Sequence, residues 1–308
     1  MNKRRVVLAV AVWLAVSPLA RADAVIKVEG QAMGDVVETS ATEVTLQGRG
    51  STARTKIPVN EIRAIRYTDE PARLNTARTA IEAGRNEDAV TGLEDINVAG
   101  IRRKQVKQDV FFYTALAKAR IALAGTDAEA IVEAGRLMAA FVKDHPDSYH
   151  YLEACEVVGD MLVAAGKYTP AQDYYGRVAQ APWPDYQMRA GVALGRALSA
   201  EGKVGEALKQ FQAVLDTEAS GESAAQQRLA ATLGKARCQA EAGQADEAVK
   251  LIQGGIDKAD AEKTLLHARA YNALGLAHRK AGRVQDALLA YLHVDVLYFN
   301  SPKEHIEA

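Results

Sequence analysis

One short segment of the sequence gathers side chains that could bind a metal ion. Four potential ligands fall within seven residues: Asp144, His145, Asp147 and His150. Imidazole and carboxylate groups suit zinc and related metals, but these two histidines are separated by Pro146 and do not share one helical face. The pattern therefore indicates a junction between two helices, in which Asp147 or Ser148 caps the second. No metal site is expected.

A glycine-rich run has the spacing of a dinucleotide-binding loop. Gly48, Gly50 and Ala53 follow that order, but the fingerprint works only when a helix comes directly after it, so that the helix N-terminus meets the pyrophosphate. A short strand is expected over residues 53–57 instead. We interpret the run as the loop of a β-hairpin and expect no cofactor.

The other chemically interesting residues also have simpler explanations. Two cysteines, Cys155 and Cys238, are too few for a disulfide framework or a zinc ribbon, and we interpret both as buried small residues. A basic run over residues 102–107 is interpreted as a solvated helix face, and the aromatic clusters at 111–113 and 149–151 as packing between helices. Because no pair of acid and base and no activated nucleophile emerges, the sequence does not predict an enzyme.

The composition is that of a globular, helix-rich chain. Of its 308 residues 48% are hydrophobic and 25% charged, while only 6% are aromatic. Few large rings and many alanines favour helices that lie close together. The net charge is −1, and it is more negative without the basic first 22 residues. Nucleic-acid binding, which needs a strongly basic domain, is therefore not expected.

The N-terminus resembles a secretory signal. A basic start is followed by an apolar run over residues 6–16, then by the small residues of a cleavage site ending at Ala22. Eleven apolar residues are too few to cross a bilayer, which takes about 20. Residues 1–22 predict an exported protein of the periplasm, the extracellular space or the cell envelope. An uncleaved anchor is the alternative.

Residues 25–68 alternate between apolar and polar side chains, which predicts four or five short strands. A single tight turn is expected over residues 59–62, just before the last strand. The strand order and this turn resemble a small SH3-like or Sm-like barrel. Such a small unit buries little surface alone, and only three residues separate Tyr67, at the end of the last strand, from Pro71, so we expect the unit to dock on the first pair of helices.

After Pro71 the period changes to that of an α-helix and does not change back. Three helix starts have the form of a capping box, at Thr126, Thr169 and Ser301. Four residues follow Glu304, too few for a closing helix. We therefore expect an uncovered apolar edge made by Leu288, Leu292 and Val296.

A short module occurs six times in the helical region: a glycine, four residues, then an alanine. The glycines stand at positions 84, 125, 166, 202, 243 and 282, and the alanines at 89, 130, 171, 207, 248 and 287. Such a glycine can end one helix in the left-handed conformation, and the alanine lets the next helix approach closely. In most copies a large apolar residue follows four positions later: Leu93, Tyr175, Phe211, Ile252 and Tyr291. The spacing predicts stacked helical pairs.

These features resemble the tetratricopeptide repeat (TPR) family. Seven residues before the turn glycine the family has a small residue, and this chain has one in five copies: Ala77, Gly159, Gly195, Ala236 and Gly275. The second copy departs, with Lys118 in that position. Its second helix is expected to pack through Ala134, Met138 and Phe141 instead.

The resemblance implies a mainly α fold, a right-handed solenoid of about six TPR-like helix pairs over residues 71–308, preceded by the β unit. It extends to exported bacterial proteins that join a small β domain to such a solenoid. Proteins of this family bind other proteins in a concave groove lined by the first helix of each pair. The chain is therefore expected to be a non-enzymatic scaffold for protein–protein interaction. A self-associating structural or assembly component of the envelope is the alternative.

The same resemblance implies which residues face the groove. The third pair offers the acids Glu153, Glu156 and Asp160. Later pairs offer mostly bases: Arg189, Arg196, Arg237, Arg269, Asn272 and Arg279. Family members use such residues to hold an acidic peptide or a C-terminal carboxylate, and the planar guanidinium suits this task. The alternative is that these arginines are solvated or pair with acids such as Glu201 and Glu241.

Overall fold

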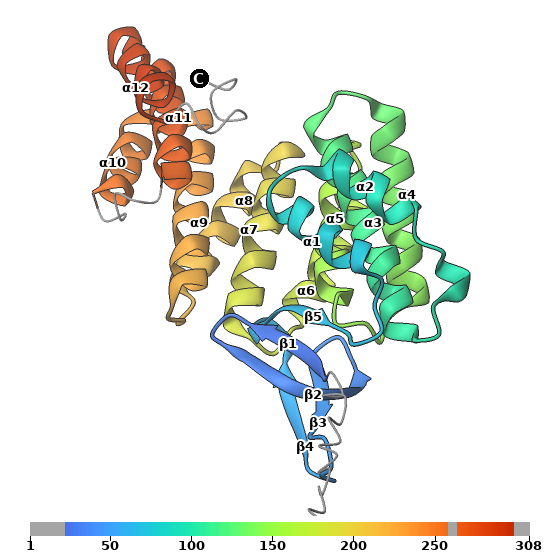
Figure 1. Ribbon diagram of the computed structural model, residues 1–308. Coiled ribbons are helices and arrows are strands. Elements are labelled where there is room, and N and C mark those ends of the chain that lie inside the picture. The colour runs from blue at the N-terminus through green and yellow to red at the C-terminus, as the bar shows by residue number, and fades with distance from the viewer. Residues whose placement is uncertain (1–21, 258–263, 299–308) are drawn as a thin grey trace, which may run out of the picture.

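A computed structural model shows a small β-sheet followed by a long stack of helices (Figure 1). The structure describes residues 22–257 and 264–298. The expected signal sequence and the helix start at Ser301 lie outside these ranges, apart from Ala22 itself. Among the described residues, no helix is both long and apolar enough to cross a membrane.

The period-two region forms one antiparallel sheet with the order β4-β3-β2-β1-β5. Its strands are β1 (Asp23–Lys27), β2 (Gln31–Thr39), β3 (Glu43–Gln47), β4 (Arg54–Pro58) and β5 (Ile62–Arg66). A 3₁₀ turn, Val59–Glu61, precedes β5 where the tight turn was expected. The glycine-rich run joins β3 to β4, which confirms it as a hairpin loop. Assignment to an SH3-like or Sm-like barrel stays a prediction.

The helices form six consecutive hairpins within the described residues. They are α1 (Ala72–Glu82) and α2 (Asn86–Glu94), α3 (Lys104–Ala124) and α4 (Ala128–Asp144), α5 (Tyr151–Ala164) and α6 (Tyr168–Ala179), α7 (Pro184–Ala200) and α8 (Val204–Asp216), α9 (Glu222–Glu241) and α10 (Ala245–Ile256), α11 (Thr264–Lys280) and α12 (Val284–Leu297). Each helix packs on the next one in the chain. The predicted mainly helical stack is confirmed, while its handedness stays a prediction.

Five of the six turn glycines have the predicted left-handed conformation. Their φ angles lie between 71° and 85°: Gly84, Gly166, Gly202, Gly243 and Gly282. Gly125 is the exception, because its backbone is extended (φ −92°, ψ −175°). Only glycine adopts a positive φ without steric cost. The five glycines with this conformation therefore allow the chain to reverse direction between the two helices of each hairpin.

Two predicted helix starts are wrong in detail. Asp127, not Thr126, caps α4, since its carboxylate accepts from the backbone N–H groups of Glu129 and Ala130. The helix that Thr169 was predicted to cap begins two residues earlier than expected, at Tyr168, and its N-cap residue Lys167 makes no side-chain cap.

In three hairpins the large residue of the second helix lies directly on the glycine at the small position of the first helix. A Cβ added to Gly159 would fall 2.4 Å from the ring of Tyr175. The same addition at Gly195 would fall 2.6 Å from Phe211. Because real atoms do not approach so closely, only glycine permits these crossings. The repeat from which the hairpins were predicted thus has a structural cause: its small residue and its large residue contact each other across the hairpin.

The second hairpin departs from this scheme as expected. Lys118 occupies the small position of α3 and turns outward to Glu94, with 2.9 Å between the charged atoms. In α4 the packing residues are Ala134, Met138 and Phe141, all buried. Without a small crossing residue, α4 packs along a longer face.

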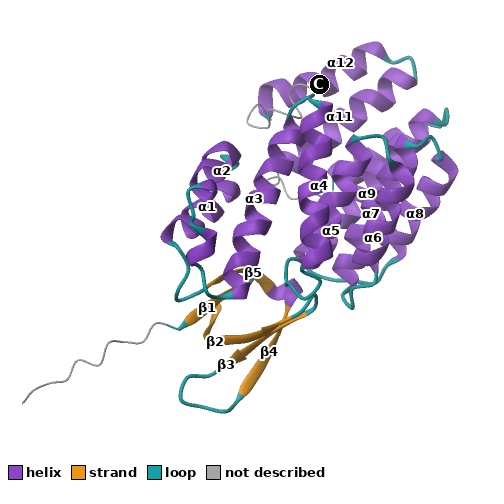
Figure 2. Ribbon diagram, turned by 90° about the vertical axis from the view of Figure 1, so that its right-hand side faces the viewer, coloured by secondary structure: helices purple, strands orange, loops and turns teal. Residues whose placement is uncertain are grey.

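The sheet is fixed to the helices by a buried ion pair. The guanidinium of Arg103 meets the carboxylate of Asp23 at 2.6 Å and donates to the carbonyl oxygen of Val36 at 2.8 Å. Arg103 was predicted to lie on a solvated face, and that prediction is wrong, because the β unit packs on the start of α3 (Figure 2). One hydrophobic core then continues from Val25 in the sheet to Leu74 in α1.

A second ionic cluster is buried between α1, α3 and α5. Arg78 binds Glu70 at 2.8 Å and Asp109 at 2.6 Å. Asp109 also contacts the ring nitrogen of His150 at 3.3 Å, and Tyr149 donates to Asp109 at the same distance. Burial favours the neutral imidazole, but the interactions with the carboxylates of Asp109 and Glu153 together outweigh it and raise the pKa of His150. These charges hold the first three hairpins together.

Candidate functional site

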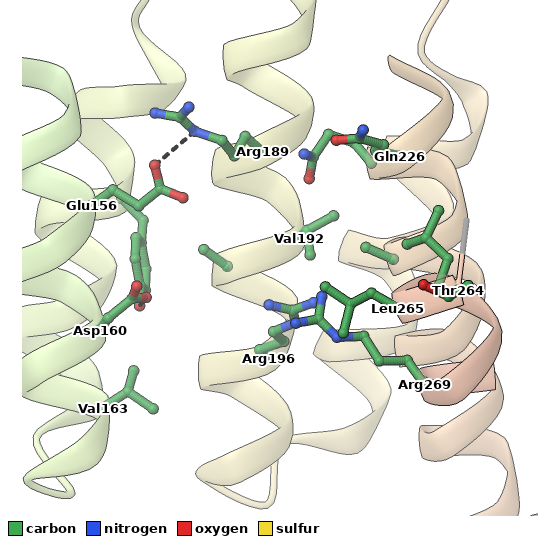
Figure 3. A pocket seen from close by; sticks show the side chains of 15 residues that line it. Glu156, Asp160, Val163, Arg189, Val192, Arg196, Gln226, Thr264, Leu265 and Arg269 are labelled. Atoms are coloured by element: carbon green, nitrogen blue, oxygen red, sulfur yellow. Dashed lines mark hydrogen bonds and ion pairs between the residues drawn. The ribbon is translucent and has the colours of Figure 1, made fainter. Parts of the chain in front are cut away.

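Two neighbouring hollows lie along the inner side of the stack. The first has a volume of about 590 Å³ and is lined mainly by α5, α7, α9 and α11, which are first helices of their hairpins (Figure 3). The second, of about 690 Å³, is lined by α7, α9 and α11, with Phe211 and Tyr291 contributed by second helices. Arg196 and Arg269 line both hollows. Together the hollows form what we call the groove.

The structure brings together all six residues predicted for the groove. Arg189, Arg196 and Arg269 line the first hollow, and the second adds Arg237, Asn272 and Arg279. Local helix geometry explains this, because residues three, four or seven apart lie on one face. Arg189 and Arg196 share the inner face of α7 in this way. Whether these residues bind a partner stays a prediction.

The acidic wall of the first hollow comes from α5. Glu156 forms an ion pair with Arg189 at 2.6 Å, and Asp160 accepts a hydrogen bond from the hydroxyl of Tyr175 at 2.7 Å. Burial raises the pKa of Glu156 to about 7, although Arg189 opposes the change. Arg189 also lies over the ring of Tyr186, 4.4 Å from its centroid. The charge of Arg189 is thus largely balanced within the protein.

The opposite wall carries two arginines from different hairpins. Arg196 of α7 and Arg269 of α11 extend into the same space (Figure 3). Burial lowers the pKa of Arg196, and the positive charge of Arg269 lowers it further. Two guanidinium groups repel each other at short range, and an anion placed between them removes that repulsion. This arrangement is suited to binding a carboxylate or another anion.

The remaining groove residues differ in how they are held. Arg237 pairs with Glu241 at 3.4 Å, one turn further along α9, as the simpler explanation for it predicted. Glu201 pairs with Lys203 and accepts from Gln172, so it is not a partner of the groove arginines. Asn272 is buried among them in the second hollow.

The segment with four potential metal ligands is a helix junction. Asp147 binds Lys104 and accepts from Gln108, while His150 points into the buried ionic cluster. Asp147 therefore does not cap α5, and Ser148 accepts only from the N–H of His150. In the described part of the chain, no three His, Cys, Asp or Glu side chains are grouped as a metal site.

Sequence reasoning missed one polar contribution to the groove. Tyr175 was predicted only as a large packing residue of the second helix, yet its hydroxyl donates to Asp160 in the first hollow. The position of its ring follows from the repeat. The hydrogen bond needed the neighbouring helix in place, so the repeat spacing alone could not indicate it.

No family model matches this sequence, and no curated protein matches it. Several solved structures are similar over part of the chain. MamA (AMB-1) is 18% identical over 75% of this chain and 100% of its own, with a TM-score of 0.38. A putative kinesin light chain of Podosopora anserina with TPR-like repeats is 19% identical over 61% and 96%, at 0.44. NprR in complex with its cognate peptide NprX is 16% identical over 73% and 64%, at 0.49.

Proposed function

We propose that this protein is a non-enzymatic scaffold of the cell envelope, which binds an acidic segment of another protein in its groove. The observation that carries the proposal is the meeting of Arg196 and Arg269, two like charges from separate hairpins in one open hollow. Glu156 and Asp160 stand on the opposite wall. A segment with carboxylates toward the arginine wall fits this distribution of charge.

Two features of the chain support a binding role over catalysis, and a third supports its location. The six residues predicted for the groove are arginines and an amide, which bind and orient a ligand but do not act as nucleophiles. Cys155 and Cys238 are buried outside the two hollows, and burial raises the pKa of both thiols, which makes them poor nucleophiles. The signal-like residues 1–22 support a place in the periplasm, the extracellular space or the envelope.

A direct test uses labelled peptides of defined charge. An aspartate-rich peptide and a lysine-rich peptide of equal length are titrated with the mature chain and followed by fluorescence anisotropy. We expect the acidic peptide to bind and the basic one not to. In the variant Arg196→Glu with Arg269→Glu, affinity falls by at least roughly 100-fold, because each charge-assisted hydrogen bond contributes about 1.5–3 kcal/mol.

A matched control separates the groove from overall charge. Arg63 and Arg66 are exposed on β5, far from the groove in the sequence. The variant Arg63→Glu with Arg66→Glu changes the net charge equally and is expected to keep its affinity. Equal losses in both variants would show unspecific attraction and contradict the proposal. Crosslinking in intact cells with the same variants then identifies the natural partner.

A further inference from the structure

The inner face of α11 carries two arginines that are separated by apolar residues. Arg269 and Arg279 both line the second hollow and stand ten residues apart in the same helix. Because an α-helix rises 1.5 Å per residue, their backbone positions are about 15 Å apart along the helix axis. Between them α11 presents Ala273 and Leu276 to the same hollow. Along this helix the hollow is therefore cationic at both ends and apolar in the middle.

The apolar middle is completed by residues of two other helices. Leu233 and Gly234 of α9 line the hollow together with Ala273 and Leu276, and all four are partly exposed. The ring of Phe211 from α8 lies against Gly234, since a Cβ added there would fall 2.4 Å from it. Apolar side chains that are still in contact with water gain free energy when a ligand covers them with an apolar group.

The charges that line the second hollow do not cancel. The charged side chains are Arg196, Arg237, Glu241, Arg269 and Arg279. Arg237 and Glu241 pair with each other at 3.4 Å, which leaves three arginines in excess. Arg279 is exposed and has no ion-pair partner among the residues that the structure describes. The end of the hollow at Arg279 is thus a second position for an anion, separate from the one between Arg196 and Arg269.

An extended peptide matches this spacing when two of its acids are four residues apart. A β-strand rises about 3.3 Å per residue, so residues i and i+4 are about 13 Å apart. Side chains alternate between the two sides of a strand, so residues i, i+2 and i+4 face the same way. Two carboxylates can then reach the two cationic ends while the residue halfway between them faces the apolar middle. In a helical peptide the same two acids would be only about 6 Å apart along the axis.

We propose that the groove recognises an extended segment of the form acid-x-apolar-x-acid, in which one acid binds Arg196 and Arg269 and the other binds Arg279. This inference rests on the proposed function, because it takes the ligand to be an acidic peptide. It adds a spacing, a central apolar residue and a role for Arg279, none of which follows from charge alone. A guanidinium binds a carboxylate through two parallel hydrogen bonds, so each end can fix the position of the peptide.

Two peptides of equal composition test the spacing. The spaced peptide is Ser-Ser-Asp-Ser-Leu-Ser-Asp-Ser-Ser, and the clustered peptide is Ser-Ser-Asp-Asp-Ser-Leu-Ser-Ser-Ser. Each is labelled at its N-terminus and amidated at its C-terminus, then titrated with the mature chain and followed by fluorescence anisotropy. We expect the spaced peptide to bind at least roughly tenfold more tightly, because only this peptide places a carboxylate at each end of the hollow. Replacing its leucine by serine should weaken binding.

A pair of variants in the last turn of α11 tests the role of Arg279. In Arg279→Gln the advantage of the spaced peptide should disappear, while the clustered peptide should bind nearly as before. Lys280→Gln is the matched control, because Lys280 is also exposed and its replacement removes the same charge, but it does not line the hollow. This control should keep the preference for the spaced peptide. Circular dichroism checks that both variants fold.

The possible failures of this inference and of the proposed function are distinguishable. Equal binding of the spaced and clustered peptides, or a preference that survives Arg279→Gln, would overturn the spacing and leave the proposed function in place. If the aspartate-rich peptide binds and neither of these two peptides does, only this inference is wrong. If no acidic peptide binds, the proposed function is wrong as well.

Discussion

Arg103 and Asp23 lie 80 residues apart in the sequence, yet their charged groups meet at 2.6 Å where the sheet joins the helices. The carboxylate of Asp23 also accepts the backbone N–H of Val36, and its side chain is almost completely buried. Burial opposes ionisation of Asp23, but Arg103 and the backbone donors outweigh it and lower the pKa of this carboxyl. A single ion pair therefore connects β1, β2 and α3.

Removing the arginine from this pair is expected to be costly. In Arg103→Met the carboxylate of Asp23 is left buried without its partner, which destabilises a protein by about 3–5 kcal/mol. Urea unfolding followed by circular dichroism measures the change. Arg49→Met, which breaks the exposed pair with Asp35, serves as control and is expected to have little effect. Equal costs for both variants would contradict the structural role of Arg103.

Replacing Gly195, where α7 crosses α8, is expected to lower the free energy of unfolding. Gly195→Ala places a methyl group 2.6 Å from the ring of Phe211 and forces the hairpin apart, at a cost of about 1–3 kcal/mol. Gly176→Ala, in α6 where nothing lies within 4 Å, is the matched control. It is expected to stabilise the helix by up to about 1 kcal/mol, because alanine has the higher helix propensity. Thermal unfolding should shift in opposite directions for the two variants.

The buried imidazole of His150 predicts a pH dependence of stability. Its pKa is raised in the folded state above the value of about 6.5 in the unfolded chain. The stabilisation is therefore fully present below about pH 6.5 and is lost as the pH rises through the folded pKa. Urea unfolding between pH 6 and 9 should show this decline, and His150→Gln should flatten it. A decline that is unchanged in His150→Gln would assign the effect to another group.

Binding in the groove should depend on the shape of the cationic groups as well as their charge. Arg196→Lys with Arg269→Lys keeps both charges but removes the planar fork that binds a carboxylate through two parallel hydrogen bonds. We expect roughly tenfold weaker binding of the aspartate-rich peptide. Raising the salt concentration should weaken binding to both chains, since partly exposed charges are screened. Full affinity in the lysine variant would show that only net charge matters.

The repeated hairpins could be predicted from the sequence because their signals are local. A turn glycine fixes one backbone angle, and Gly195 and Phe211 meet at a separation set by two helices and one turn. The inner face of α7 was predicted from the resemblance to the TPR family, which placed Arg189 and Arg196 on it. At Gly125 the prediction of a left-handed turn was wrong, because Asp127 starts the next helix and the backbone stays extended.

Charges whose partners come from distant segments could not be predicted in this way. Arg103 stands in a basic run, and only the folded sheet brings Asp23 to it. Asp109 occupies a helical position like that of any surface acid, yet Arg78 and His150 enclose it. Spacing along one helix carries no information about either contact.

The two arginines of the groove stand on α7 and α11, and α9 packs between these helices. Any force between these two side chains therefore acts across two interfaces, that of α7 with α9 and that of α9 with α11. We expect an anion bound between the two guanidinium groups to draw the hairpins of α7 and α11 closer together. The curvature of the stack would then change when an anion binds. Because α12 packs on α11, it would move together with that helix.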